Sequence, residues 1–189
     1  MYLIFTDRDK GKAILANEPN VKTILENIAG SFDNYTMKAF SRTGINFRIK
    51  QTELLTHSFY VILFDNGEYH TLSFYGTEIA TYSEGAWAYD TESDISSYQM
   101  YLEGDNKWNV QELFQGDTIN IRDTLRNILN KIGSGTTYFY KDHIFNKPNM
   151  NNCNTALYET VELEQGEDGG SRGDTAADPP FRFAFGSLP

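Results

Sequence analysis

Cysteine and histidine are scarce in this chain, and each shortage excludes a class of site. Its 189 residues include one cysteine and three histidines. A single cysteine rules out an internal disulfide framework and a zinc site built from several cysteines. The three histidines lack helical spacing, and the sequence has no glycine-rich phosphate loop and no His-Glu-x-x-His motif. We therefore expect neither a metal ion nor a cofactor.

Basic residues and long apolar runs are also in short supply. The 16 basic residues face 26 acidic ones, a formal net charge of −10, which argues against a nucleic-acid partner because such surfaces are basic. No apolar run approaches the roughly 18 residues of a membrane-spanning helix. The first residues show no signal-peptide pattern. The sequence thus predicts a protein without a transmembrane segment, placed in the cytoplasm or exported without a signal peptide.

Aromatic residues, by contrast, are abundant, with 13 Phe, 12 Tyr and 2 Trp. They are typical of a β-rich domain with a solid core, and the length suits one such domain. The clearest strand signal is a hairpin: Thr56 to Phe64, then Asp65-Asn66-Gly67, then Tyr69 to Tyr75. If Asn66 and Gly67 are its two central turn residues, Leu63 pairs with His70 and His57 with Gly76.

Apolar spacing and end signals predict the other elements. Helices are expected from the cap at Asn20 to Gly30, from Ile121 to Ile132 between a cap at Asn120 and a stop at Gly133, and from Cys153 onward. Strands are expected at 35–40, 45–50, 98–102 and 137–140, a strand or short helix at 108–114, and a loop at 76–94 that holds Trp87 and Tyr89.

Cys153 and His57 are the candidate reactive pair. A cysteine at a helix start is favoured as a thiolate because the positive end of the helix dipole and a nearby imidazolium both lower its pKa. A histidine where a strand begins can reach a cleft, accept the thiol proton and return it to a leaving group. The alternative is a small buried cysteine and a histidine that only fills the core.

The order of these pieces resembles the circularly permuted papain-like families, which include permuted relatives of the NlpC-type peptidoglycan hydrolases and the lecithin retinol acyltransferase-like enzymes. In these families the histidine strand precedes the cysteine helix. The matching pieces are Thr56-His57-Ser58-Phe59-Tyr60-Val61-Ile62-Leu63 and Tyr138 followed by Asn151-Asn152-Cys153-Asn154-Thr155-Ala156-Leu157.

The resemblance implies an α+β fold of the circularly permuted papain-like type, an antiparallel sheet packed on the helix that carries the cysteine. It covers about residues 45–162. We expect residues 1–44 to form an N-terminal extension with one helix and a strand. Residues 163–189, acidic and rich in Gly and Pro, are expected to form a disordered tail.

The third catalytic group is less well defined. The resemblance suggests His70, a second histidine about a dozen residues after the first. The expected register instead puts His70 on the same face as His57 but roughly 20 Å away, at about 3.3 Å per residue. Glu78 lies diagonally across from His57 in that register and is slightly favoured as the orienting carboxylate; an exposed loop carboxylate is the alternative. Asn152 and Asn151 are expected to cap the helix or donate to an oxyanion.

The same resemblance adds Tyr138 to the supporting residues. It implies a cysteine-dependent hydrolase of amides or peptides. The substrate class it suggests is bacterial cell-wall peptides, cleaved by a toxin or effector domain that has an inhibitor or immunity protein as partner. A lipid acyltransferase or phospholipase of the same fold is the first alternative, favoured by an apolar rim near Trp87 and Trp108. A non-catalytic interaction domain, with Cys153 buried away from His57, is the second.

Overall fold

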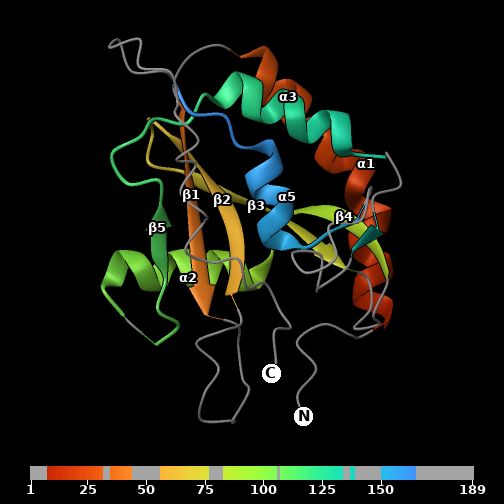
Figure 1. Ribbon diagram of the computed structural model, residues 1–189, viewed down its shortest axis with the longest axis horizontal. Helices are drawn as coiled ribbons and strands as arrows, with labels where there is room; N and C mark the ends of the chain where they lie inside the picture. Colours follow the sequence, from red (N-terminus) through yellow and green to blue (C-terminus); the bar gives the residue numbers. More distant parts are fainter. Residues whose placement is uncertain are drawn as a thin grey trace.

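A mixed α+β arrangement is seen in the computed structural model, which describes residues 8–31, 35–43, 56–76, 83–105, 107–133, 137–138 and 150–164. Glu78 and the expected strand at 45–50 lie outside this part of the chain. The described strands form one sheet in the order β5-β1-β2-β3-β4-β6-β7 (Figure 1). Its strands are β1 Tyr35–Thr43, β2 Thr56–Phe64, β3 Tyr69–Gly76, β4 Ser83–Tyr89, β5 Gln111–Leu113, β6 Thr137–Tyr138 and β7 Met150–Asn151.

Helices cover both faces of this sheet. They are α1 Arg8–Gly30, α2 Glu92–Glu103, α3 Ile121–Lys131 and α5 Cys153–Thr160. Leu25 of α1, Leu125 of α3 and Leu157 of α5 share one buried apolar cluster with Tyr60 and Ile62 of β2. The opposite face packs on α2 through a second cluster of aromatic and aliphatic side chains: Phe40, Phe59, Val61, Tyr98 and Val110. In the described residues, no helix is long and apolar enough to span a bilayer.

The antiparallel part of the sheet extends from β5 through β1, β2 and β3 to β4. β4 is followed by the two-residue strands β6 and β7, which pair with each other in parallel. The expected antiparallel sheet with a helix that begins at the cysteine is therefore present. Residues 35–43, expected in an N-terminal extension, form a strand inside this sheet. Leu163, expected in the tail, forms a bridge with Ile119.

Several elements predicted from local signals are confirmed. The hairpin strands β2 and β3 have the expected bounds to within one residue. Helix α3 begins after Asn120, whose side chain accepts from the Asp123 N–H, and Gly133 follows it with a φ of 74°. Helix α5 begins at Cys153 with Asn152 as its cap. The region 108–114 contains a strand, although it covers only the three residues of β5.

The expected loop at 76–94 and the expected strand at 98–102 are wrong. The first contains β4 with Trp87 in its middle, and the second lies inside α2. Thr91 caps α2 by accepting from the Asp94 N–H, and Gly104 ends the helix in the left-handed conformation. The aromatic residues Tyr98 and Tyr101 resemble a strand by composition, but their spacing of three places both on the buried side of a helix. Helix α1 is also longer than expected, since it begins at Arg8 rather than after Asn20.

The hairpin register differs by one residue from the expected one. Ile62, not Leu63, lies opposite His70. Gly67 N–H donates to the Phe64 carbonyl at 2.9 Å, and Phe64 N–H donates to the Glu68 carbonyl at 2.9 Å, so the loop has three residues. Gly67, with a φ of 87°, takes the left-handed position as the third of them. Because side chains alternate along a strand, a one-residue shift moves His70 to the face opposite His57.

Among the residues that the structure describes, the first residues of β2 are not paired with β3. The described pairs of the β2–β3 ladder run from Leu63↔Tyr69 to Tyr60↔Leu72, whereas β2 itself starts at Thr56. Helix α5 packs against this open end (Figure 1). Tyr60 donates its hydroxyl to the Leu157 carbonyl at 2.8 Å, and Ser58 donates to Asn154 Oδ1 at 2.6 Å. The helix that carries the cysteine is therefore fixed to the first half of β2.

Candidate active site

Cys153 is the first residue of α5, and the polar side chains of Asn152 and Thr155 fix the start of this helix. The Asn152 carboxamide oxygen accepts from the Asn154 and Thr155 N–H groups at 2.9 Å each, and the Thr155 hydroxyl accepts from the Asn152 N–H at 2.8 Å. This reciprocal capping box satisfies the second and third N–H groups of the helix, but not the first, which belongs to Cys153. The Cys153 side chain is only 1% exposed.

The open end of β2 surrounds the Cys153 sulfur. The Cys153 thiol lies 3.9 Å from the Thr56 carbonyl oxygen that accepts from it, and the backbone N–H of Ser58 is close enough to lower the Cys153 pKa. Between these two residues, His57 projects toward the α2 face and lies close enough to the sulfur to lower the Cys153 pKa through its charge and a hydrogen bond. The gap in the β2–β3 ladder thus lets a cysteine on a helix of one face meet a histidine on the other. In the described structure Cys153 and His57 are adjacent.

Asp94 of α2 is the third member of this group. His57 Nε2 lies 3.1 Å from Asp94 Oδ1, and both side chains are 1% exposed. The ring nitrogen is close enough for a hydrogen bond but its N–H is not aligned for one, so the attraction is mainly between the charges. The other partners of the carboxylate are Ser73 Oγ at 2.6 Å, Thr91 Oγ1 at 2.8 Å, Tyr75 Oη at 3.1 Å and Arg42 Nη2 at 3.2 Å.

Arg42 lies next to the histidine on the adjacent strand. In the β1–β2 ladder it is directly opposite His57, so both side chains project from the same face. Its guanidinium carbon is 5.6 Å from the centre of the Trp108 ring, a cation–π arrangement. The arginine side chain is as deeply buried as Asp94, each being 1% exposed. The site therefore contains four buried groups that can carry charge near neutral pH, Cys153, His57, Asp94 and Arg42, with the buried Tyr75 phenol beside them.

The charges of these groups determine one another's pKa values. Burial would raise the Cys153 pKa, but the charge and hydrogen bond of His57, the Ser58 N–H and the charge of Arg42 together lower it. Burial would likewise lower the His57 pKa, but Asp94 and Cys153 raise it above its ordinary value. The Asp94 pKa is well below its ordinary value, because His57, Arg42 and Ser73 outweigh burial. This pattern favours a thiolate beside an imidazolium.

Among the other sequence-predicted residues, His70 is separate from this group. His70 lies at the far end of the hairpin, where Nδ1 contacts Asp90 Oδ2 at 2.7 Å and its ring stacks on Tyr89. Glu78 lies outside the described residues. Asn151 ends β7 immediately before the cap, and Tyr138 ends β6 directly opposite Asn151 in the parallel ladder. Asn152 serves as the cap, one of the two roles expected for it.

Sequence reasoning missed Asp94 and Arg42. A signal for Asp94 was present: Thr91-Glu92-Ser93-Asp94 has the spacing of a capping box before a helical pattern. Recognising it would have replaced the expected loop and strand with a helix start. No comparable signal marks Arg42, because alternation along β1 does not distinguish a buried arginine from an exposed one.

Two further features bear on substrate choice. Trp87, near which an exposed apolar rim would favour a lipid substrate, is 1% exposed and belongs to the core. Trp108 is half-buried beneath Arg42. Of the two tryptophans, Trp87 therefore contributes no exposed apolar surface, whereas Trp108 is partly exposed.

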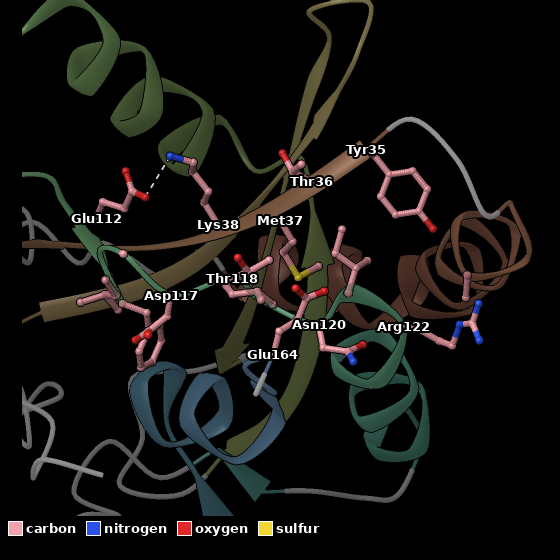
Figure 2. A pocket seen from close by; sticks show the side chains of 16 residues that line it. Tyr35, Thr36, Met37, Lys38, Glu112, Asp117, Thr118, Asn120, Arg122 and Glu164 are labelled. Carbon is pink, nitrogen blue, oxygen red and sulfur yellow. Dashed lines mark hydrogen bonds and ion pairs between the residues drawn. The ribbon is translucent and has the colours of Figure 1, made fainter. Parts of the chain in front are cut away.

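A cavity of about 630 Å³ lies at the other end of β1 (Figure 2). Its lining includes Tyr35 to Lys38 of β1 and the polar side chains of Glu112, Asp117, Asn120 and Glu164. Lys38 and Glu112 form an ion pair at 2.9 Å on its wall. Arg42 is four to seven residues farther along the strand, roughly 13–23 Å at about 3.3 Å per residue. The cavity is therefore separate from the Cys153 site.

Comparison with known proteins adds no assignment to this geometry. No protein-family model, curated protein or solved structure matches the chain. In the described part of the chain, no group of three or more His, Cys, Asp and Glu side chains is placed to hold a metal ion. What the site can do therefore has to be argued from its own residues.

Proposed function

We propose that this protein is a cysteine-dependent hydrolase of amide bonds, with Cys153 as nucleophile, His57 as acid–base and Asp94 as the carboxylate that stabilises the imidazolium. One observation carries the proposal: three side chains from β2, α2 and α5 converge at the start of α5 in a buried, charge-paired group. A nucleophile next to a base, with the base held by a third group, is the arrangement that nucleophilic catalysis requires.

The chemistry follows from the position of each group. The Cys153 thiolate attacks the substrate carbonyl carbon, and the first N–H of α5, which the Asn152 cap does not take up, is the group available to the oxyanion. His57 gives its proton to the leaving amine as the thioester forms. Water then attacks the thioester while the neutral His57 takes its proton, which releases the acid and restores the thiolate and the imidazolium.

A peptide is favoured over a lipid as the acyl donor. The lipid alternative depended on an apolar rim, and Trp87 is a core residue. The resemblance to permuted papain-like enzymes supports a peptide, including a bacterial cell-wall peptide, and leaves an inhibitor or immunity protein as a possible class of partner. A purely structural cysteine is disfavoured by the buried charges at the site, because a core that needs only packing avoids the desolvation cost of several ionised groups.

The first test is a titration of the thiol itself. Ultraviolet thiolate absorbance needs no access to the sulfur, which suits a side chain that is 1% exposed. We expect a thiolate well below the free-thiol pKa of about 8.5, and a return toward that value in His57→Gln. The Cys153→Ser protein gives the blank, since the chain has one cysteine. An ordinary thiol pKa that is the same in parent and variant would reject the proposal.

The second test looks for acyl transfer. An activated thioester or aryl ester of a short peptide is incubated with the protein, and the acyl-enzyme is sought by intact-mass measurement after acid quench. We expect one acyl group on the parent protein and none on Cys153→Ser. Because the sulfur is covered, acylation is expected to be slow, and mild urea that opens this end without unfolding the chain should accelerate it. Acylation of Cys153→Ser to the same extent would place the reaction elsewhere.

A further inference from the structure

Arg42 is a buried cation that the proposed reaction does not itself use. A buried arginine is uncommon unless it is paired, and this one is paired with the carboxylate that faces His57. Its contact with Asp94 is not the two-pronged fork that gives the strongest ion pairs. Nη2 makes the contact, and among the described residues the buried Nε has no hydrogen-bond partner. Arg42 therefore acts on Asp94 mainly through its positive charge, and not through a two-pronged hydrogen bond.

Arg42 balances the summed charge of the buried groups at the site. In the proposed reactive state the thiolate of Cys153 and the carboxylate of Asp94 are both negative, and the imidazolium of His57 by itself balances one of these two charges. Arg42 provides a second positive charge, which makes the buried group neutral overall. Without it a net negative charge would remain out of contact with water, and such a charge is disfavoured.

We propose that Arg42 is a positioning residue of this site, whose guanidinium fixes the Asp94 carboxylate and balances the charge of the Cys153 thiolate. This inference rests on the proposed function. In the described part of the chain, the ionisable groups around Arg42 are Asp94 of α2, His57 of β2, Tyr75 of β3 and Cys153 of α5. Glu112 of β5 shares its face but contacts Lys38 and Tyr101.

Removing the positive charge with Arg42→Gln should shift the titration of the Cys153 thiol and that of the His57 imidazole in the same direction. Loss of a positive charge disfavours the thiolate and favours the imidazolium, so the Cys153 and His57 titrations should both move to higher pH, by about one pH unit. Asp94→Asn removes a negative charge and should move both to lower pH. Arg42→Lys keeps the charge in a different shape and should restore most of the parent profile. A side chain that served only packing would not give shifts of opposite sign.

The measurement is thiolate absorbance against pH on the full chain, with circular dichroism to show that each variant is folded. Arg42→Gln leaves Asp94 without one partner and is the variant most at risk of unfolding. A second comparison therefore sets Asp94→Asn against the Arg42→Gln/Asp94→Asn double variant, which removes both members of the pair. We expect the double variant to titrate at higher pH than Asp94→Asn alone.

The outcomes separate the two proposals. A parent protein with an ordinary thiol would reject the proposed function and this inference together. A parent thiolate whose titration is unchanged in Arg42→Gln, or in the double variant relative to Asp94→Asn, would reject the role of Arg42 and leave the Cys153–His57 pair intact. If Arg42→Gln shifts the thiolate titration and Arg42→Lys does not restore it, the charge of Arg42 is not what matters. The shape of the guanidinium would then be the cause, which would contradict the proposed role.

Discussion

Two histidines of one hairpin each contact an aspartate, and their surroundings differ sharply. His70 and Asp90 approach to 2.7 Å with side chains that are 34% and 31% exposed. His57 and Asp94 are farther apart, at 3.1 Å, but are 1% exposed. Water screens the first pair, whereas the second acts at low effective dielectric, where the same charges interact several-fold more strongly. Burial and additional partners, rather than the shorter distance, distinguish the candidate site.

The largest expected difference between the pairs is in activity. His57→Gln should abolish formation of the acyl-enzyme, with a loss of roughly 10³-fold or more if the residue acts as general base. His70→Gln should leave the rate within about twofold, because the side chain lies on the other face of the sheet. Acyl-enzyme formation, followed by intact mass, measures both. A comparable loss in the two variants would mean that the hairpin fold, not the base, had been disturbed.

Stability should separate the two aspartates next. Asp94→Asn leaves Arg42 and His57 without their carboxylate, and breaking a buried pair costs about 3–5 kcal/mol of unfolding free energy. Asp90→Asn removes a partly exposed partner and should cost less than about 1 kcal/mol. Urea unfolding at constant pH gives both values, provided the slope with urea is unchanged. Equal costs would contradict the distinction drawn from burial.

The pH dependence of stability sharpens the same comparison. Because the Asp94 pKa is lowered in the folded protein, its contribution is present above the unfolded value of about 3.9 and is lost as pH falls. Because the His57 pKa is raised, its contribution is complete below the unfolded value of about 6.5 and is lost as pH rises through the folded pKa. The stability advantage of the parent over His57→Gln should therefore be greatest near pH 4–6. An advantage that grew above pH 8 would have the wrong sign.

The smallest expected effect concerns the turn that places the histidines on opposite faces. Gly67 has a φ of 87° and open space around it, so Gly67→Ala should cost about 1 kcal/mol through backbone conformation alone. Gly30→Ala is the control, since Gly30 ends α1 without a positive φ and also has open space. The two are compared by thermal unfolding. Equal effects would indicate that the left-handed turn residue does not limit the hairpin.

How far the sequence predicts this molecule depends on how local each signal is. The hairpin strands, α3 and the start of α5 were predicted correctly, because caps, stops and alternation act within a few residues. Asp94 was missed because its partner is 37 positions away in the chain, at His57, and because aromatic composition was taken for a strand where α2 forms. The expected pairing of β2 with β3 was wrong by one residue because the length of the hairpin loop was misjudged. Asn66-Gly67 indicates a hairpin, but whether the loop has two residues or three depends on packing that only the folded sheet supplies.

The single cysteine also allows local opening of the structure to be measured by chemical labelling. Its sulfur is nearly inaccessible and is held where α5 packs against the open end of β2. A thiol reagent can therefore modify it only when that end opens. At reagent concentrations where opening and closing are fast relative to labelling, the modification rate gives the free energy of that opening directly. Compared with global unfolding measured in urea, it would tell whether α5 detaches alone or together with the sheet.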